Sequence, residues 1–157
     1  MKINYQSLEK KIDVKFKNKD LLVQALTHKS FNPNENNEKI EFLGDRVLGL
    51  VIAKKLLEIY PGEKEGILDK KFASLVNKKT CLDIAKKINL ASYVKTFNPN
   101  NKKIKIEDKI ISDSCEALIG AIYLDKGFAI VEKTILNLWQ DHTVSYTHLR
   151  AHETQDD

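Results

Sequence analysis

Three carboxylates recur at helical spacing within residues 37–50, a stretch that is otherwise rich in apolar side chains. At about 100° per residue, Glu38, Glu41 and Asp45 fall within a wedge of about 60° on a helical wheel. The same face continues at Ile52 with apolar residues typical of a core, where like charges are costly. A bound cation would offset that repulsion, so the spacing indicates a metal site.

These acids also have a structural interpretation. Acidic side chains favour the first turn of a helix, near the positive end of its dipole, which accounts for Glu35 and Glu38. It does not account for Asp45, about two turns inside and flanked by Leu43 and Val47, where an unpaired carboxylate needs a partner or a raised pKa. A spaced acidic triplet also arises by chance on solvated helices, so this segment alone leaves both interpretations open.

A second acidic pair lies in residues 110–121, where Asp113 and Glu116 are three apart on one helix face. Each acidic face also carries a small residue, Gly49 in the first helix and Gly120 in the second. We therefore expect the two backbones to approach closely where the carboxylates meet. Converging carboxylates would repel one another unless divalent ions lay between them. Oxygen ligands without histidine or thiolate favour Mg²⁺ or Mn²⁺ over zinc.

The composition is that of a soluble globular chain with a basic surface. Of 157 residues, 42% are hydrophobic and 31% charged, and the net charge is +4. No apolar run approaches the roughly 18 residues of a membrane span. No signal peptide is visible, so we expect a cytoplasmic protein with no membrane association. Lysine doublets such as Lys70-Lys71 and Lys102-Lys103 suit either solvated helix faces or a polyanionic partner. A net basic chain with a concentrated acidic cluster has the charge layout needed to hold phosphates beside a divalent metal, which favours the polyanionic partner.

A helical scaffold must position the acids. Hydrophobic periodicity predicts helices and no convincing strand, so the expected class is all-α, built around a long central helix. That helix begins near Asn37 and runs to Ile59, before Pro61 and Gly62 stop it. We expect further helices at residues 7–12, 20–26, 65–77, 81–88, 106–124 and 128–139.

The domain is expected to span residues 1–141, with residues 142–157 as a disordered tail. The tail has no apolar periodicity, and its composition departs abruptly from the rest, as at a truncation junction or a cloning scar. It contains His148 and His152, four residues apart. Because no acid or thiol stands at a matching spacing, we do not expect them to bind metal.

The acidic stretches resemble the two signature motifs of the ribonuclease III family. Residues 37–45 resemble the first motif, and residues 113–121 are similar to the second. Residues 25–30 and 64–66 also match, and the resemblance covers about residues 8–139. It implies an all-helical endonuclease domain that forms a homodimer and cleaves double-stranded RNA with Mg²⁺. Its products would carry a 5′-phosphate and a 3′-hydroxyl with short 3′ overhangs, as in rRNA and mRNA processing.

The resemblance also implies roles for single residues. Glu41, Asp45, Asp113 and Glu116 match the metal-binding carboxylates, for which Mn²⁺ is expected to substitute for Mg²⁺. Asp45 and Glu116 are expected to act directly in catalysis, supported by Glu38. Two metal ions held by such acids would lower the pKa of a bound water and stabilise the leaving 3′-oxygen.

Two further matches concern the partner subunit. Phe42 matches an aromatic residue that enters a pocket on the partner, and Glu65 matches an acid that reaches the partner's cleft. The chain departs from the family at Arg46, where a small residue is usual, and at residues 69–72. It also lacks the double-stranded RNA-binding domain of bacterial members, so we expect either a truncated enzyme or a stand-alone catalytic domain.

Two alternatives stand beside the endoribonuclease. One is a non-catalytic RNA-binding or ribosome-associated relative of the same fold, which would have no reason to keep all four metal ligands. The other is an unrelated helical phosphohydrolase that acts on nucleotides with Mg²⁺. Incubation with labelled duplex RNA, with and without Mg²⁺, separates the three.

Overall fold

The computed structural model describes residues 2–99 and 105–143 of the chain. Within them the only β pairing is an isolated bridge between Thr27 and Lys95, which confirms the all-α prediction. None of the helices in this part is both long and apolar enough for a membrane crossing. The helices in chain order are α1 (Tyr5–Ile12), α2 (Lys19–Ala25), α3 (Glu38–Ile59), α4 (Glu65–Val76), α5 (Lys78–Lys87), the short 3₁₀ helix η1 (Leu90–Tyr93), α6 (Asp108–Lys126) and α7 (Phe128–Leu138).

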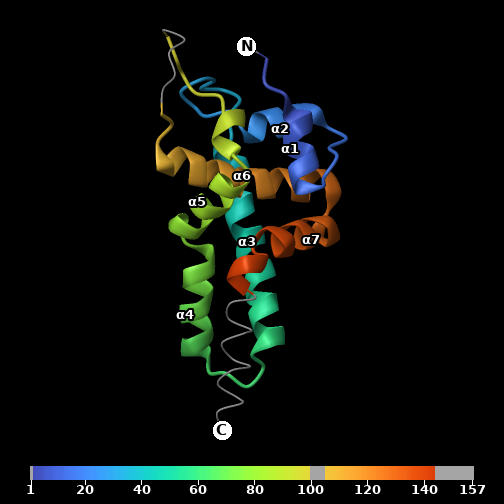
Figure 1. Cartoon of the computed structure of the whole chain (residues 1–157), viewed down its shortest axis with the longest axis vertical. Helices are drawn as coiled ribbons and strands as arrows, with labels where there is room; N and C mark the ends of the chain where they lie inside the picture. The colour runs from blue at the N-terminus through green and yellow to red at the C-terminus, as the bar shows by residue number, and fades with distance from the viewer. Residues whose placement is uncertain (1, 100–104, 144–157) are drawn as a thin grey trace.

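The centre of the fold is the crossing of α6 over the first half of α3 (Figure 1). A Cβ on Gly44 would lie 1.7 Å from the carbonyl oxygen of Glu116, and one on Gly120 would lie 2.3 Å from that of Ile40. Only glycine fits at either point. The expected contact through Gly120 is confirmed, whereas Gly49 is wrong as its counterpart, because Gly49 faces the Phe72 ring of α4.

Helix α6 is the core of the domain. From Ile111 to Ile122 every residue except Asp113 is buried. Such burial on all sides requires neighbours all around, and α2, α3, α5 and α7 supply them. A side chain that α6 carries is therefore held in place by packing on several sides, which makes it a rigid support for chemistry.

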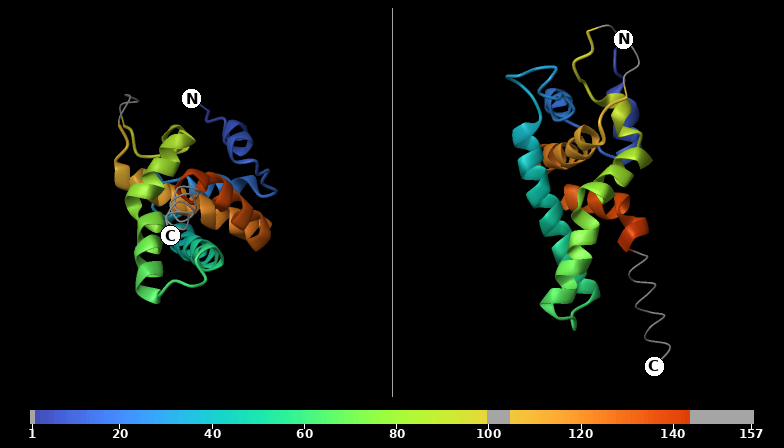
Figure 2. Two further views of the ribbon diagram at one scale, coloured as in Figure 1. Left: turned by 60° about the horizontal axis from the view of Figure 1, so that its bottom comes forward. Right: turned by 90° about the vertical axis from the view of Figure 1, so that its left-hand side faces the viewer.

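Helices α3 and α4 form an antiparallel hairpin that extends away from the rest of the molecule (Figures 1 and 2). The chain turns at Pro61, which cannot continue a helix. Along α3, Phe42, Leu50 and Leu57 are exposed, and their spacing places them within about 80° on the helix surface. These three side chains form an apolar stripe that stays exposed, although Arg46 lies over the Phe42 ring.

The start of α5 differs from the prediction. The sequence analysis placed Asn77 at the end of a helix over residues 65–77, but α4 ends at Val76 and Asn77 is the N-cap of α5. The side-chain oxygen of Asn77 accepts a 2.8 Å hydrogen bond from the Thr80 N–H. Asparagine is a strong N-cap because its side chain satisfies a backbone donor that has no partner in the helix. Lys78 therefore lies in the first turn of α5, whereas the sequence analysis left it between two predicted helices.

The predicted tail is described only at His142 and Thr143. The rest of residues 142–157, including His148 and His152, lies outside the described residues. So do Lys102 and Lys103, and the expectations for all of them stay predictions.

Candidate metal centre

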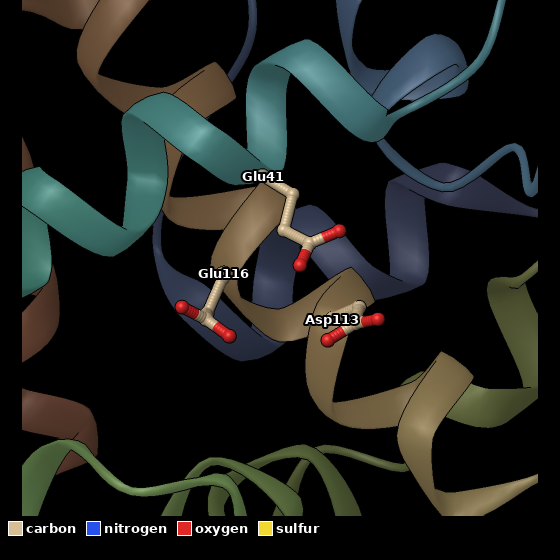
Figure 3. A group of neighbouring side chains, drawn as sticks. All are labelled: Glu41, Asp113 and Glu116. Carbon is tan, nitrogen blue, oxygen red and sulfur yellow. The ribbon is translucent and has the colours of Figure 1, made fainter.

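Three acids from two helices meet at the crossing of α3 and α6. Glu41 extends from α3 toward Asp113 and Glu116 of α6, as Figure 3 shows. One carboxylate oxygen of each residue can be chosen so that all three lie within 4.8 Å of one another. They line a cavity of about 490 Å³ that also includes Asp45 and Glu38 in its wall.

The glycine contact explains why these acids converge. Gly44 touches the backbone at Glu116 itself, and Glu41 precedes Gly44 by one helical turn. Gly120 follows Glu116 by one turn and meets the backbone of α3 at Ile40, the residue before Glu41. The close contact thus brings the two acidic turns together while their side chains project beside it into the cavity.

A lysine that the sequence analysis did not single out lies among the acids. The Nζ of Lys78 is 2.7 Å from Asp113 and 3.7 Å from Glu41, and it also donates a hydrogen bond to Glu116. Lys109 adds a second cation, 2.8 Å from the other oxygen of Asp113. The expectation that only divalent ions could offset the repulsion is therefore wrong, because side-chain ammonium groups compensate part of it. The sequence does hold one signal for Lys78, because it follows Asn77, a residue type that favours the N-cap and could have marked the start of α5.

The acids differ in how this environment affects their ionisation. Burial, followed by a hydrogen bond shared with Asp45, raises the pKa of Glu116 to about 7 against the opposing effect of Lys78. Burial and the neighbouring Asp113 carboxylate also raise the pKa of Glu41. Burial would raise the pKa of Asp113 too, but hydrogen bonds from Lys109 and Lys78 outweigh it and lower the pKa. Without metal the cluster therefore carries less negative charge than its number of carboxylates indicates.

Asp45 lies at the rim, contrary to the buried position inferred from its apolar neighbours. Its side chain is 51% exposed and forms a 3.3 Å ion pair with Arg46. Asp45 is not one of the three acids whose oxygens lie within 4.8 Å of one another, although it is close enough to Glu116 to share a hydrogen bond.

The remaining predicted residues lie around or away from the cluster. Glu38 is in the cavity wall, exposed, with only a 3.9 Å ion pair to Lys29. Phe42 lines the same cavity and is 63% exposed. Glu65 begins α4 at the other end of the hairpin, beyond the roughly 27 Å of helix that separates Glu41 from Ile59. Within one subunit Glu65 cannot reach the cluster.

Comparisons with known proteins agree with this geometry. The family model described as Ribonuclease-III-like matches residues 18–141. Ribonuclease 3 of Pelagibacter ubique is 67% identical over 142 residues, which are 90% of this chain and 64% of that protein. Ribonuclease 3 of Aliarcobacter butzleri is 42% identical and is matched over 88% of this chain and 62% of its own length. The chain belongs to the ribonuclease III family. It spans less than two thirds of the length of these relatives.

Solved structures of the ribonuclease III family support the fold. The nuclease domain of ribonuclease III from Campylobacter jejuni superposes with a TM-score of 0.84 at 41% identity, covering 88% of this chain and 98% of that domain. That structure is reported for flexibility in the region involved in dimer formation. The similarity extends over nearly the whole nuclease domain, so the predicted ribonuclease III endonuclease-domain fold is confirmed.

The cluster has the donor set that a hard divalent cation prefers. All three converging side chains offer carboxylate oxygens, which suits Mg²⁺ or Mn²⁺. Two of them come from α6, whose burial fixes their backbone, and the cavity leaves room for further oxygen ligands. A cation already lies between the carboxylates in the form of the Lys78 ammonium, so the site accommodates positive charge.

Proposed function

We propose that this chain is the catalytic domain of an endoribonuclease that hydrolyses phosphodiesters of double-stranded RNA in a Mg²⁺-dependent reaction. The observation that carries the proposal is the convergence of Glu41, Asp113 and Glu116 at the crossing of α3 and α6, in a chain of the ribonuclease III family. The products would have a 5′-phosphate and a 3′-hydroxyl with short 3′ overhangs. Processing of rRNA and mRNA in the cytoplasm is the setting that we infer.

Each acid has a role in this proposal. Glu41, Asp45, Asp113 and Glu116 would hold Mg²⁺, which supplies charge stabilisation and a water of lowered pKa when bound. Asp113 and Glu116 form the rigid side of the site, because they stand on buried α6. Asp45 and Glu116 act closest to the reacting phosphate, and exposed Glu38 supports them from the cavity wall. The chain needs to supply no nucleophile of its own.

Duplex RNA suits the cavity because basic side chains surround the acids. Lys29, Arg46, Lys78 and Lys109 line the same cavity, where they can contact phosphates on either side of a bound metal. Such contacts follow the backbone of A-form RNA without reading its bases, so strong sequence preference is not expected. Affinity should fall steeply with salt.

A homodimer would complete the enzyme. Phe42 is exposed beside the acids at the head of the apolar stripe, which is the surface we propose for the partner subunit. In a two-fold dimer each subunit presents the same stripe, so two acidic clusters would face one duplex and cut opposite strands. Glu65, which is remote from the cluster of its own subunit, is proposed to approach the partner's cleft.

Incubation of the protein with end-labelled duplex RNA tests the proposal. We expect cleavage with Mg²⁺, slower or no cleavage of the single strands, and none in EDTA. Duplex binding without cleavage at any Mg²⁺ or Mn²⁺ concentration would favour the non-catalytic relative. Hydrolysis of free nucleotides, with duplex RNA left intact, would favour the phosphohydrolase.

A further inference from the structure

Lys78 places its ammonium between the same three carboxylates that we propose as metal ligands. The Nζ makes a 2.7 Å hydrogen bond to Asp113, a second hydrogen bond to Glu116 and a 3.7 Å ion pair with Glu41. Among the described residues, no other lysine forms ion pairs with all three acids. Lys109, for example, forms an ion pair only with Asp113, through the Oδ2 atom, and its side chain is 79% exposed.

An ammonium and a metal ion cannot share this position. Mg²⁺ binds oxygens at 2.0–2.1 Å, so two oxygens on one ion are at most about 4.2 Å apart. The three carboxylate oxygens, which lie within 4.8 Å of one another, would surround such an ion, and the Lys78 Nζ already lies among these carboxylates. Electrostatic repulsion between the ammonium and the metal ion also prevents both from occupying the cluster at once.

Of the groups involved, Lys78 is the one free to move. Asp113 and Glu116 are carried by the buried helix α6. Lys78 stands in the first turn of α5, its side chain is 57% exposed, and its flexible stem can carry the ammonium into solvent without any change of backbone. Rotation of the Lys78 side chain is therefore enough to take its ammonium out of the acidic cluster.

We propose that Lys78 is an internal counter-ion, which occupies the cation position of the acidic cluster in the metal-free protein and leaves it when a divalent ion enters. This proposal rests on the metal site of the proposed function. Lys78 then has two opposite effects. It stabilises the metal-free fold by pairing with acids that would repel one another, and it lowers the affinity for divalent metal because each ion must displace it.

Calorimetric titration of Mn²⁺ into RNA-free protein tests the proposal. Lys78→Met keeps most of the side-chain volume and removes the charge, while Lys79→Met is the matched control at the next, exposed position of α5. We expect Lys78→Met to bind Mn²⁺ about tenfold more tightly than the parent, since a competing positive charge is gone. In EDTA its melting temperature should fall below that of Lys79→Met. The control should match the parent in Mn²⁺ affinity.

The outcomes separate this proposal from the proposed function. If the parent protein binds Mn²⁺ as tightly as Lys78→Met, or more tightly, the counter-ion role of Lys78 is refuted while the proposed metal site is retained. If neither the parent nor Lys78→Met binds Mn²⁺, both the counter-ion role and the proposed metal site are refuted.

A second measurement uses the parent protein and so does not depend on a variant that folds. Brief acetylation with mass spectrometry should find Lys78 protected in EDTA and reactive with saturating Mg²⁺, with Lys79 reactive in both. Equal reactivity of Lys78 in the two conditions contradicts its displacement.

Discussion

Glu116 and Asp45 both carry a carboxylate, but they differ in how deeply that carboxylate is buried. Glu116 is 1% exposed on the buried helix α6, whereas the side chain of Asp45 is half exposed at the rim. A buried carboxylate costs free energy unless cations or hydrogen bonds compensate it, so Glu116 depends on its neighbours far more than Asp45 does. Replacement of Glu116 is therefore the most direct test of the cluster.

Glu116→Gln should reduce RNA cleavage more than about a hundredfold, because it removes an anionic ligand while it keeps the shape of the side chain. The fold should survive, since a neutral amide is cheaper to bury than a carboxylate, although Lys78 loses one of its partners. Single-turnover cleavage and circular dichroism measure the two effects. Glu35→Gln, at an exposed loop position, serves as the control. Activity of Glu116→Gln within about tenfold of the parent would exclude the proposed ligand role.

The sequence predicted the acids of this site but not its lysine. Carboxylates at helical spacing on an apolar face are conspicuous, because such a face is costly to charge. Lys78 belongs to one of several lysine doublets, all of which suit a solvated helix surface. Which of these lysines turns inward depends on where α5 begins and on how it packs against α6, and both are properties of the tertiary structure.

At the scale of elements, the crossing of α3 and α6 depends on two glycines. The helical wheel selected Gly49 because it shares the acidic face, yet the structure uses Gly44. The reason is geometric: a residue at the centre of a backbone contact points at the partner helix, whereas the acids must point past that contact into the cavity. Helix positions followed from periodicity, and the central helix matches its prediction to within one residue. The contact point between the helices required the three-dimensional structure.

Gly44→Ala and Gly49→Ala form a matched pair that tests the crossing. At Gly44 the added methyl group would overlap the Glu116 carbonyl, so we expect a loss of more than about 3 kcal/mol in the free energy of unfolding. At Gly49 the methyl group meets the Phe72 ring at 3.4 Å, and alanine favours helix, so the change should be within about 1 kcal/mol of zero. Urea denaturation measures both. Equal losses would mean that α3 and α6 are not in backbone contact at Gly44.

Glu9 joins α1 to the start of α2. Its buried carboxylate accepts 2.7 Å hydrogen bonds from the Phe16 N–H and from Lys19. Burial alone would raise the pKa of Glu9, but these two donors outweigh it and hold the pKa below its ordinary value of 4.5. A carboxyl group whose pKa is lower in the folded state adds stability above the ordinary pKa and loses it as the pH falls through the folded value.

Glu9→Gln should therefore cost about 1–3 kcal/mol of unfolding free energy at neutral pH. The difference from the parent should shrink as the pH falls below 4.5, and urea denaturation at a series of pH values measures it. Glu58→Gln is the control, since its ion pair with Lys54 is exposed and contributes little. A difference that stays constant down to pH 3 would mean that the effect comes from packing and not from charge.

At the scale of the whole molecule, α3 exposes large apolar side chains. Phe42, Leu50 and Leu57 form an exposed apolar stripe along one helix, and Ile67 is exposed on the adjacent α4. Arg46 lies over one face of the Phe42 ring, 3.9 Å from its centroid, and covers only that face. Aligned apolar side chains of this size usually mark an interface. The stripe begins beside the acidic cavity, so a second copy docked there would bring two cavities together.

Phe42→Asp should convert a dimer into a monomer. An aspartate in the partner's pocket would have to be buried without a compensating cation, at a cost of several kcal/mol, which is enough to dissociate the pair at micromolar concentration. Double-strand cutting should fall with dimerisation even though every proposed metal ligand remains. Light scattering on the eluted protein measures the mass, and cleavage of labelled duplex measures the activity.

Leu124→Asp is the matched control for this test. Leu124 is 54% exposed near the end of α6, so a charge there meets solvent and the assembly should be unaffected. If the parent is monomeric at micromolar concentration, or if Phe42→Asp remains dimeric, the stripe is not the contact between subunits. If both variants dissociate, the dimer is sensitive to surface charge in general, and the assignment to Phe42 fails. Loss of the dimer in Phe42→Asp alone would place the partner beside the acidic cavity, where cleavage of two strands requires it.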